Sequence, residues 1–149
     1  AFVGRLFPNL TVQGYGIASY AHSLLKQFKG EWEYDTNWKM INGHPKKAGW
    51  IKAIQEGQQK VRKGLKLDCP ILVMSSNRSY PETEEWHNEY LSSDIVLNVH
   101  DIQKYAPKLG NYVTRDTIVG GIHDLILSEK PSRDHTYQTV FSWMTEKNF

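Results

Sequence analysis

Residues 113–124 read Val-Thr-Arg-Asp-Thr-Ile-Val-Gly-Gly-Ile-His-Asp. The first part, 113–119, is predicted to form a strand, and the two glycines and His123 form a loop just beyond its carboxyl end. Open α/β sheets place ligands and catalytic groups at these strand ends. A loop histidine is more often merely solvated or hydrogen-bonded, so this position alone makes His123 a candidate functional residue and no more.

The neighbouring segments extend this strand into an α/β pattern. Ile71–Met74 is a continuous apolar run, typical of a strand in a parallel sheet that is buried on both faces. A polar segment over 75–93 follows, with a short helix expected around 84–86. A helix around 102–109, closed by Gly110, then leads to the strand at 113–119, and a last helix is predicted over 133–146. The order strand, loop, helix, strand, loop, helix predicts an α/β fold with a parallel sheet.

The N-terminal part reads differently. Residues 1–16 look irregular, and apolar residues at helical spacing then predict an amphipathic helix over 17–28, stopped by Gly30. Residues 31–45 are expected to be mostly loop, and a second helix is expected from Pro45 to about Gly64. Two predicted strands are too few for an independent sheet. We therefore expect the rest of the sheet to be missing and the chain to form a homodimer, or to aggregate, through the exposed sheet edge.

Composition excludes several classes of protein. The chain has 149 residues and a net charge of +2, so nothing in it demands a nucleic-acid partner. No apolar stretch approaches the roughly 18 residues of a membrane span. The lone cysteine, Cys69, cannot form an internal disulfide, which favours a reducing compartment and a cytoplasmic protein. Because Cys69 leads straight into the apolar run, it is expected to be buried.

Taken together, the apolar strand at 70–74, Asp94-Ile95-Val96-Leu97 with the helix after it, and the Gly120-Gly121-Ile122-His123-Asp124 loop resemble the closing strands of the α/β-hydrolase superfamily. The likeness is strongest to the serine aminopeptidase and lysophospholipase-like hydrolases, including monoacylglycerol lipases. The resemblance implies that residues 69–149 are the C-terminal part of an α/β-hydrolase core. Residues 1–68 match only loosely, as helical cap or lid segments do.

The resemblance also implies roles for residues of a catalytic triad. His123 takes the place of the general base. In many members of the family the acid falls at the register of Ser79, which cannot serve. The resemblance therefore implies a longer loop here, with Asp94 as the match to the acid. Asp124 and Asp68 are poorer alternatives. The alternative for Asp94 is an ordinary role as a helix cap or surface residue.

The nucleophile is absent from these residues. The family's Gly-x-Ser-x-Gly elbow does not occur, and the family order of serine, acid and histidine puts the serine upstream of residue 1. Ser75, Ser76 and Ser79 lack flanking glycines and read as polar loop residues. The implied activity is hydrolysis of a small-molecule acyl ester with no cofactor, and the missing N-terminal half is the implied partner. The chain alone should be inactive.

Two other classes of function stay open. A non-catalytic interaction module that kept the hydrolase fold would tolerate replacement of His123. A metal enzyme that uses His123 and Asp124 would hold a metal, but no metal-binding spacing of His and Cys supports it. The aromatic residues of the expected lid are either its core or walls of an acyl-binding cleft, and they are Trp32, Tyr34, Trp38 and Trp50.

Overall fold

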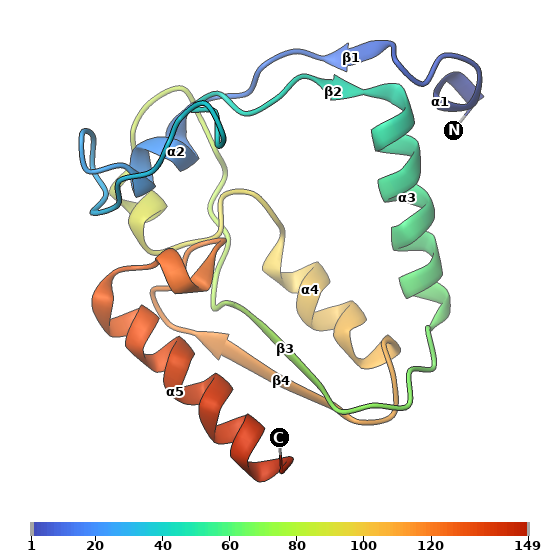
Figure 1. The fold of residues 1–149 in the computed structure, drawn as a ribbon, viewed down its shortest axis with the longest axis vertical. Coiled ribbons are helices and arrows are strands. Elements are labelled where there is room, and N and C mark those ends of the chain that lie inside the picture. The colour runs from blue at the N-terminus through green and yellow to red at the C-terminus, as the bar shows by residue number, and fades with distance from the viewer. Residues whose placement is uncertain (1, 149) are drawn as a thin grey trace.

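A computed structural model describes residues 2–148 and shows a mixed α/β arrangement with two small sheets (Figure 1). The α-helices and strands are α1 (Phe2–Leu6), β1 (Thr11–Gln13), α2 (Ser19–Leu24), β2 (Lys46–Lys47), α3 (Ala48–Lys63), β3 (Ile71–Ser76), α4 (Val99–Tyr105), β4 (Val113–Ile118) and α5 (Lys130–Glu146). Short 3₁₀ helices are η1 (Asn88–Leu91), η2 (Ala106–Lys108) and η3 (Leu125–Leu127).

The predicted strands β3 and β4 form a parallel pair. Their register aligns Ile71 with Val113 and Ser76 with Ile118. Parallel neighbours need a crossover, and the chain between them supplies one through η1, α4 and η2. The prediction of a parallel α/β unit is therefore confirmed, with β3 running two residues beyond the apolar run to Ser76.

Helices α4 and α5 lie on opposite sides of this strand pair (Figure 1). On the α4 side, the Gln103 side-chain amide donates a hydrogen bond of 2.9 Å to Ser75 Oγ. On the α5 side, Trp143 Nε1 donates one of 3.2 Å to Thr114 Oγ1. Side chains alternate between the faces of a strand, and the register puts Ser75 and Thr114 on opposite faces. Each face of the pair is thus covered by one helix.

The N-terminal part contains more regular structure than its sequence predicts. Residues 1–16 were expected to be irregular, but α1 and the strand β1 occur there, and β1 pairs antiparallel with β2. The helix expected over 17–28 is shorter, because α2 ends at Leu24 and the chain turns back to let the Trp32 N–H bond the Leu24 carbonyl. The helix expected after Pro45 is confirmed as α3, with Gly64 at its C-cap at φ +96°.

Much apolar surface is left uncovered. Ile118 and Tyr90 are fully buried, but Ile71–Met74 are only half-buried, so the expected burial on both faces is not reached. Cys69 is exposed, and the expectation that it is buried is wrong, because it precedes β3 on an exposed linker. The short helix expected near 84–86 is also wrong in position, since the helical turn there is η1. Across residues 2–148, no helix has the length and apolar character needed to cross a membrane.

Candidate active site

The loop after β4 turns sharply at its two glycines. Gly120 adopts φ +71°, a conformation that L side chains rarely tolerate. A Cβ on Gly121 would lie 2.7 Å from the Leu125 side chain and 3.1 Å from the Ile118 carbonyl oxygen, so it would crowd the turn. Beyond the turn, Ile122 is buried and its N–H donates to Ser128 Oγ at 3.0 Å. This anchor fixes the backbone immediately before His123.

A long loop brings Asp94 alongside the end of β3. The backbone N–H of Asp94 donates to the Arg78 carbonyl, and its carbonyl accepts from the Tyr80 N–H, both at 3.0 Å. These two bonds form an isolated parallel bridge between Ser79 and Asp94. Residues 80–93 form the loop that leaves the strand end and returns to it, so that Asp94 lies beside Ser79.

The carboxylate of Asp94 is held rigidly. Its Oδ1 accepts hydrogen bonds of 2.8 Å from the backbone N–H groups of Val96 and Leu97. Its side chain is only 3% exposed. A buried carboxylate with both N–H donors in place has one oxygen left to offer a partner.

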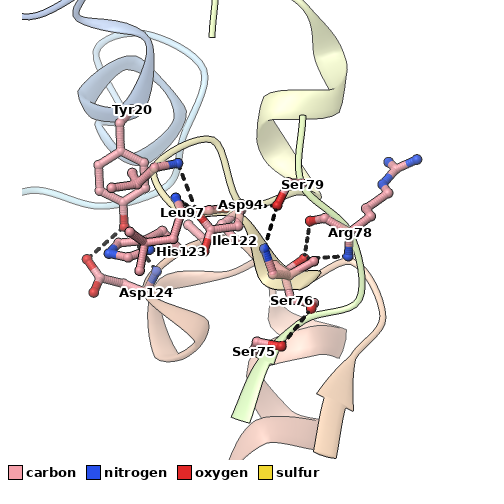
Figure 2. Close-up of polar contacts among 12 residues, drawn as sticks. Tyr20, Ser75, Ser76, Arg78, Ser79, Asp94, Leu97, Ile122, His123 and Asp124 are labelled. Carbon is pink, nitrogen blue, oxygen red and sulfur yellow. Dashed lines mark hydrogen bonds and ion pairs between the residues drawn. The ribbon is translucent and has the colours of Figure 1, made fainter. Parts of the chain in front are cut away.

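That partner is the His123 imidazole. His123 Nδ1 lies 3.0 Å from Asp94 Oδ2, and the histidine side chain is 27% exposed (Figure 2). Because a carboxylate only accepts, Nδ1 carries the proton and the lone pair of the neutral imidazole is on Nε2. Within residues 2–148 Nε2 has no hydrogen-bond partner, so it is free to accept a proton from another group. The structure thus brings together the two residues that the sequence nominated.

The surroundings shift the pKa values of both His123 and Asp94 in the direction that favours their charged forms. The hydrogen bond to Asp94 raises the pKa of His123, and burial opposes this only in part. Burial works against ionisation of Asp94, but the hydrogen bonds from His123, Leu97 and Val96 outweigh it and lower the pKa of Asp94. An imidazolium at this position is consequently stabilised, as a general base requires once it has taken up a proton.

These shifts predict a pH dependence of stability. A raised His123 pKa contributes stability below the unfolded value of about 6.5 and loses it as pH rises through the folded pKa. A lowered Asp94 pKa contributes stability at pH values above the unfolded pKa of about 3.9. This stability is lost when the pH falls through the folded pKa. The contribution of the pair to the free energy of unfolding should therefore peak between about pH 4 and 6.5. Urea unfolding of wild type and Asp94→Asn over a range of pH checks this. The free energy of unfolding should decline less above about pH 6.5 in the variant than in wild type, and an equal decline in both would contradict the prediction.

The alternative acids do not reach the imidazole nitrogen. Asp68 is exposed on the linker before β3. Asp124 Oδ2 instead accepts hydrogen bonds of 2.7 Å from Tyr20 Oη and 3.1 Å from Lys39 Nζ. Tyr20 and Lys39 are far from Asp124 in sequence, and no motif marks either of them. Sequence reasoning missed both, because their only local signal is an apolar helix face and an ordinary surface lysine.

The three serines at the end of β3 do not bond the pair. Ser75 Oγ donates to the Ser76 carbonyl, Ser76 Oγ to the Arg78 carbonyl and Ser79 Oγ to the Leu97 carbonyl (Figure 2). Each of these hydroxyls is committed to local backbone at the end of β3. Throughout residues 2–148, no serine hydroxyl forms a hydrogen bond with His123.

None of the remaining candidate residues forms a hydrogen bond with the pair within residues 2–148. No group of three or more His, Cys, Asp or Glu side chains in residues 2–148 could hold a metal ion. Trp32, Tyr34 and Trp38 line an open cavity of about 460 Å³ together with Leu127. Trp50 does not line this cavity, since it is on α3 and 54% exposed.

Comparisons of the chain with protein-family models, with curated proteins and with solved structures find no match. The support for a function is therefore the geometry of Asp94 and His123.

Proposed function

We propose that this chain supplies the histidine and the acid of a serine ester hydrolase. The observation that carries the proposal is the 3.0 Å contact between His123 Nδ1 and the buried Asp94 carboxylate, with Nε2 free of any hydrogen bond within residues 2–148. A triad needs this arrangement, because the acid fixes the imidazole tautomer that leaves Nε2 as the base.

In the proposed reaction, His123 Nε2 removes the proton of a serine hydroxyl while the serine oxygen attacks the ester carbonyl. The imidazolium then gives this proton to the leaving alcohol, and an acyl-serine forms. Water attacks the acyl-serine with the same histidine as base, which releases the carboxylic acid and restores the serine. Asp94 stabilises the imidazolium in both steps and does not itself take up the proton.

The proposal includes a parent fold. Residues 69–149 would be the C-terminal part of an α/β-hydrolase core and residues 1–68 its helical cap or lid. Support comes from the order β3, α4, β4, α5, with the acid after β3 and the histidine after β4. This is the order in which the α/β-hydrolase fold arranges its last two catalytic residues.

The proposed partner is an upstream half that carries the nucleophile. Beyond β4, β3 has no neighbouring strand within residues 2–148, so its second edge is unpaired. Tyr137, Phe141 and Met144 recur at helical spacing along α5 and are 44%, 61% and 37% exposed. Trp50 and Ile54 on α3 are 54% and 42% exposed. Apolar patches and strand edges of this kind are usually covered by further structure.

An uncovered edge has a measurable consequence. Alone, the 149-residue chain should self-associate through β3, as a homodimer or a larger aggregate. Light scattering over a range of concentrations measures this, and Val73→Lys, a charge in the middle of β3, is expected to shift the population toward monomer. A monodisperse monomer at high concentration would count against the missing half.

The proposed substrate is a small acyl ester, such as a lysophospholipid or monoacylglycerol, hydrolysed in the cytoplasm. The cavity beside Trp32, Tyr34 and Trp38 supports an apolar acyl chain, since its exposed wall is mostly apolar even though Glu33, Asp35 and Lys39 also line it. An exposed lone Cys69 is in keeping with a reducing compartment.

Labelling with a fluorophosphonate probe, followed by mass spectrometry, tests the proposal. The full-length protein should be labelled at an upstream serine in a Gly-x-Ser-x-Gly elbow, and the 149-residue chain should not be labelled. Labelling of the isolated chain would refute an upstream nucleophile. A folded full-length protein that is not labelled would favour a non-catalytic interaction module. The unpaired β3 edge would then be the natural docking surface.

A further inference from the structure

Tyr20 joins the N-terminal part of the chain to the histidine loop. Its ring comes from α2 and meets the His123 imidazole edge to face, with centroids 5.8 Å apart and planes at 79° (Figure 2). An edge-to-face contact of this kind restricts how the imidazole can rotate about its side-chain bonds. The two residues come from opposite ends of the chain, so only the fold brings them together.

The hydroxyl of Tyr20 binds the residue after His123 twice. It donates to Asp124 Oδ2 at 2.7 Å, and it accepts the Asp124 backbone N–H at 3.1 Å. The second bond fixes the peptide that immediately follows His123. On the other side of the histidine, the Ile122 N–H is fixed by Ser128 Oγ. The backbone on both sides of His123 is therefore anchored.

The same contacts keep a second carboxylate in place. Asp94, Asp124, Lys39 and Tyr20 are the titratable groups around the imidazole. Asp124 is adjacent to His123 in sequence, so a free carboxylate there could compete with Asp94 for the imidazole N–H. The bonds from Tyr20 and Lys39 occupy Asp124 Oδ2 instead. Burial, followed by the bond to Asp124, raises the pKa of Tyr20 far above its ordinary value, so the hydroxyl keeps the proton that it donates.

We propose that Tyr20 is a positioning residue for His123. The Tyr20 ring and its two hydrogen bonds to Asp124 hold the His123 imidazole against Asp94. The role rests on the proposed hydrolase function. Because Tyr20 lies on α2, in the proposed cap, the position of α2 helps to set the catalytic geometry. Displacement of α2 would therefore misplace His123.

The test compares Tyr20→Phe, which keeps the ring and removes the hydroxyl, with wild type in the full-length protein. The expected result is a kcat for a short acyl ester lowered roughly 10- to 100-fold with KM nearly unchanged, because a small misplacement of a catalytic group costs about this much. Tyr112→Phe is the matched control, since Tyr112 is 60% exposed and distant from the site. Equal kcat in wild type and Tyr20→Phe would overturn the proposal.

A second readout does not depend on catalysis. In proton NMR, the Nδ1 proton of His123 bonded to Asp94 should resonate at low field, and His123→Gln identifies the signal by its loss. In Tyr20→Phe the signal should shift or broaden, whereas in Tyr112→Phe it should persist. An unchanged signal in Tyr20→Phe would overturn the positioning role, even if the full-length protein proved to have no esterase activity. A displaced signal in an inactive protein would support the role and refute the hydrolase function separately.

Asp124→Asn supplies the coupling test. Loss of its charge leaves Lys39 uncompensated, so the pKa of His123 should fall. If Tyr20 acts through Asp124, the double variant Tyr20→Phe/Asp124→Asn should lose little more kcat than the more damaging single variant. Effects that multiply in full would show that Tyr20 acts independently of Asp124 and would overturn this part of the proposal.

Discussion

Replacing His123 by alanine in the full-length protein is expected to lower kcat for an acyl ester by roughly 10⁶-fold and to abolish fluorophosphonate labelling. The magnitude follows from known serine hydrolases, in which loss of the base costs about as much as loss of the whole triad. Nε2 of His123 is the proposed acceptor of the serine proton, and within residues 2–148 no other imidazole bonds Asp94. A steady-state assay with a chromogenic ester, with labelling in parallel, measures both effects.

His135→Ala is the matched control for this experiment. His135 is exposed on α5, so its removal should leave kcat within about twofold of wild type. Circular dichroism should show the same folded spectrum for both variants. Undiminished labelling of a folded His123→Ala protein would remove the basis for the hydrolase proposal.

Asp94→Asn is expected to lower kcat by roughly 10⁴-fold with little loss of folded protein. The asparagine carbonyl can still accept the N–H groups of Val96 and Leu97, so the loop should keep its shape. Its amide group would then donate to His123 Nδ1, which moves the ring proton to Nε2 and leaves the wrong tautomer for a base. In known serine hydrolases this change of tautomer costs about 10⁴ in kcat. The pKa of His123 should fall in the same variant, which NMR titration measures.

Two further variants separate chemistry from folding at this position. Asp94→Ala leaves the N–H groups of Val96 and Leu97 without their acceptor, and it should cost about 1–3 kcal/mol of stability in addition to activity. Asp101→Asn, in the exposed first turn of α4, should change stability by less than about 0.5 kcal/mol and leave kcat intact. If Asp94→Asn retained most of the wild-type kcat, Asp94 would be a structural cap and not the triad acid.

Several elements could be predicted because their information is local. The apolar run at 71–74 and the segment at 113–119 became β3 and β4, and the periodic segments after Pro45 and near the C-terminus became α3 and α5. Gly120 and Gly121 marked the turn that carries His123, since Gly120 adopts a positive φ and a side chain at Gly121 would crowd the turn. His123 itself was found because catalytic groups gather at the carboxyl ends of parallel strands.

Other features depended on contacts between distant residues. The helix expected over 17–28 ended early at Leu24, because a backbone bond from Trp32 replaced its last turn. The strand β1 was not predicted, since three exposed residues carry no alternating pattern and are fixed only by pairing with β2. Cys69 proved exposed because burial is set by what surrounds a residue and not by the apolar residues that follow it.

By itself, the sequence determined the parallel strand pair, the order of its helices and the identity of the histidine, because periodicity and glycine turns act over a few residues. The resemblance favoured Asp94 over Asp68 and Asp124, but only the tertiary structure shows the contact itself. The return of the 80–93 loop to Ser79 brings Asp94 Oδ2 to 3.0 Å from His123 Nδ1. The folded structure also places the Asp124 carboxylate against Tyr20, which is 104 residues away in sequence. Hydrogen bonds of fixed length select among such candidates only once the chain is folded, since spacing along the sequence does not determine distance in space.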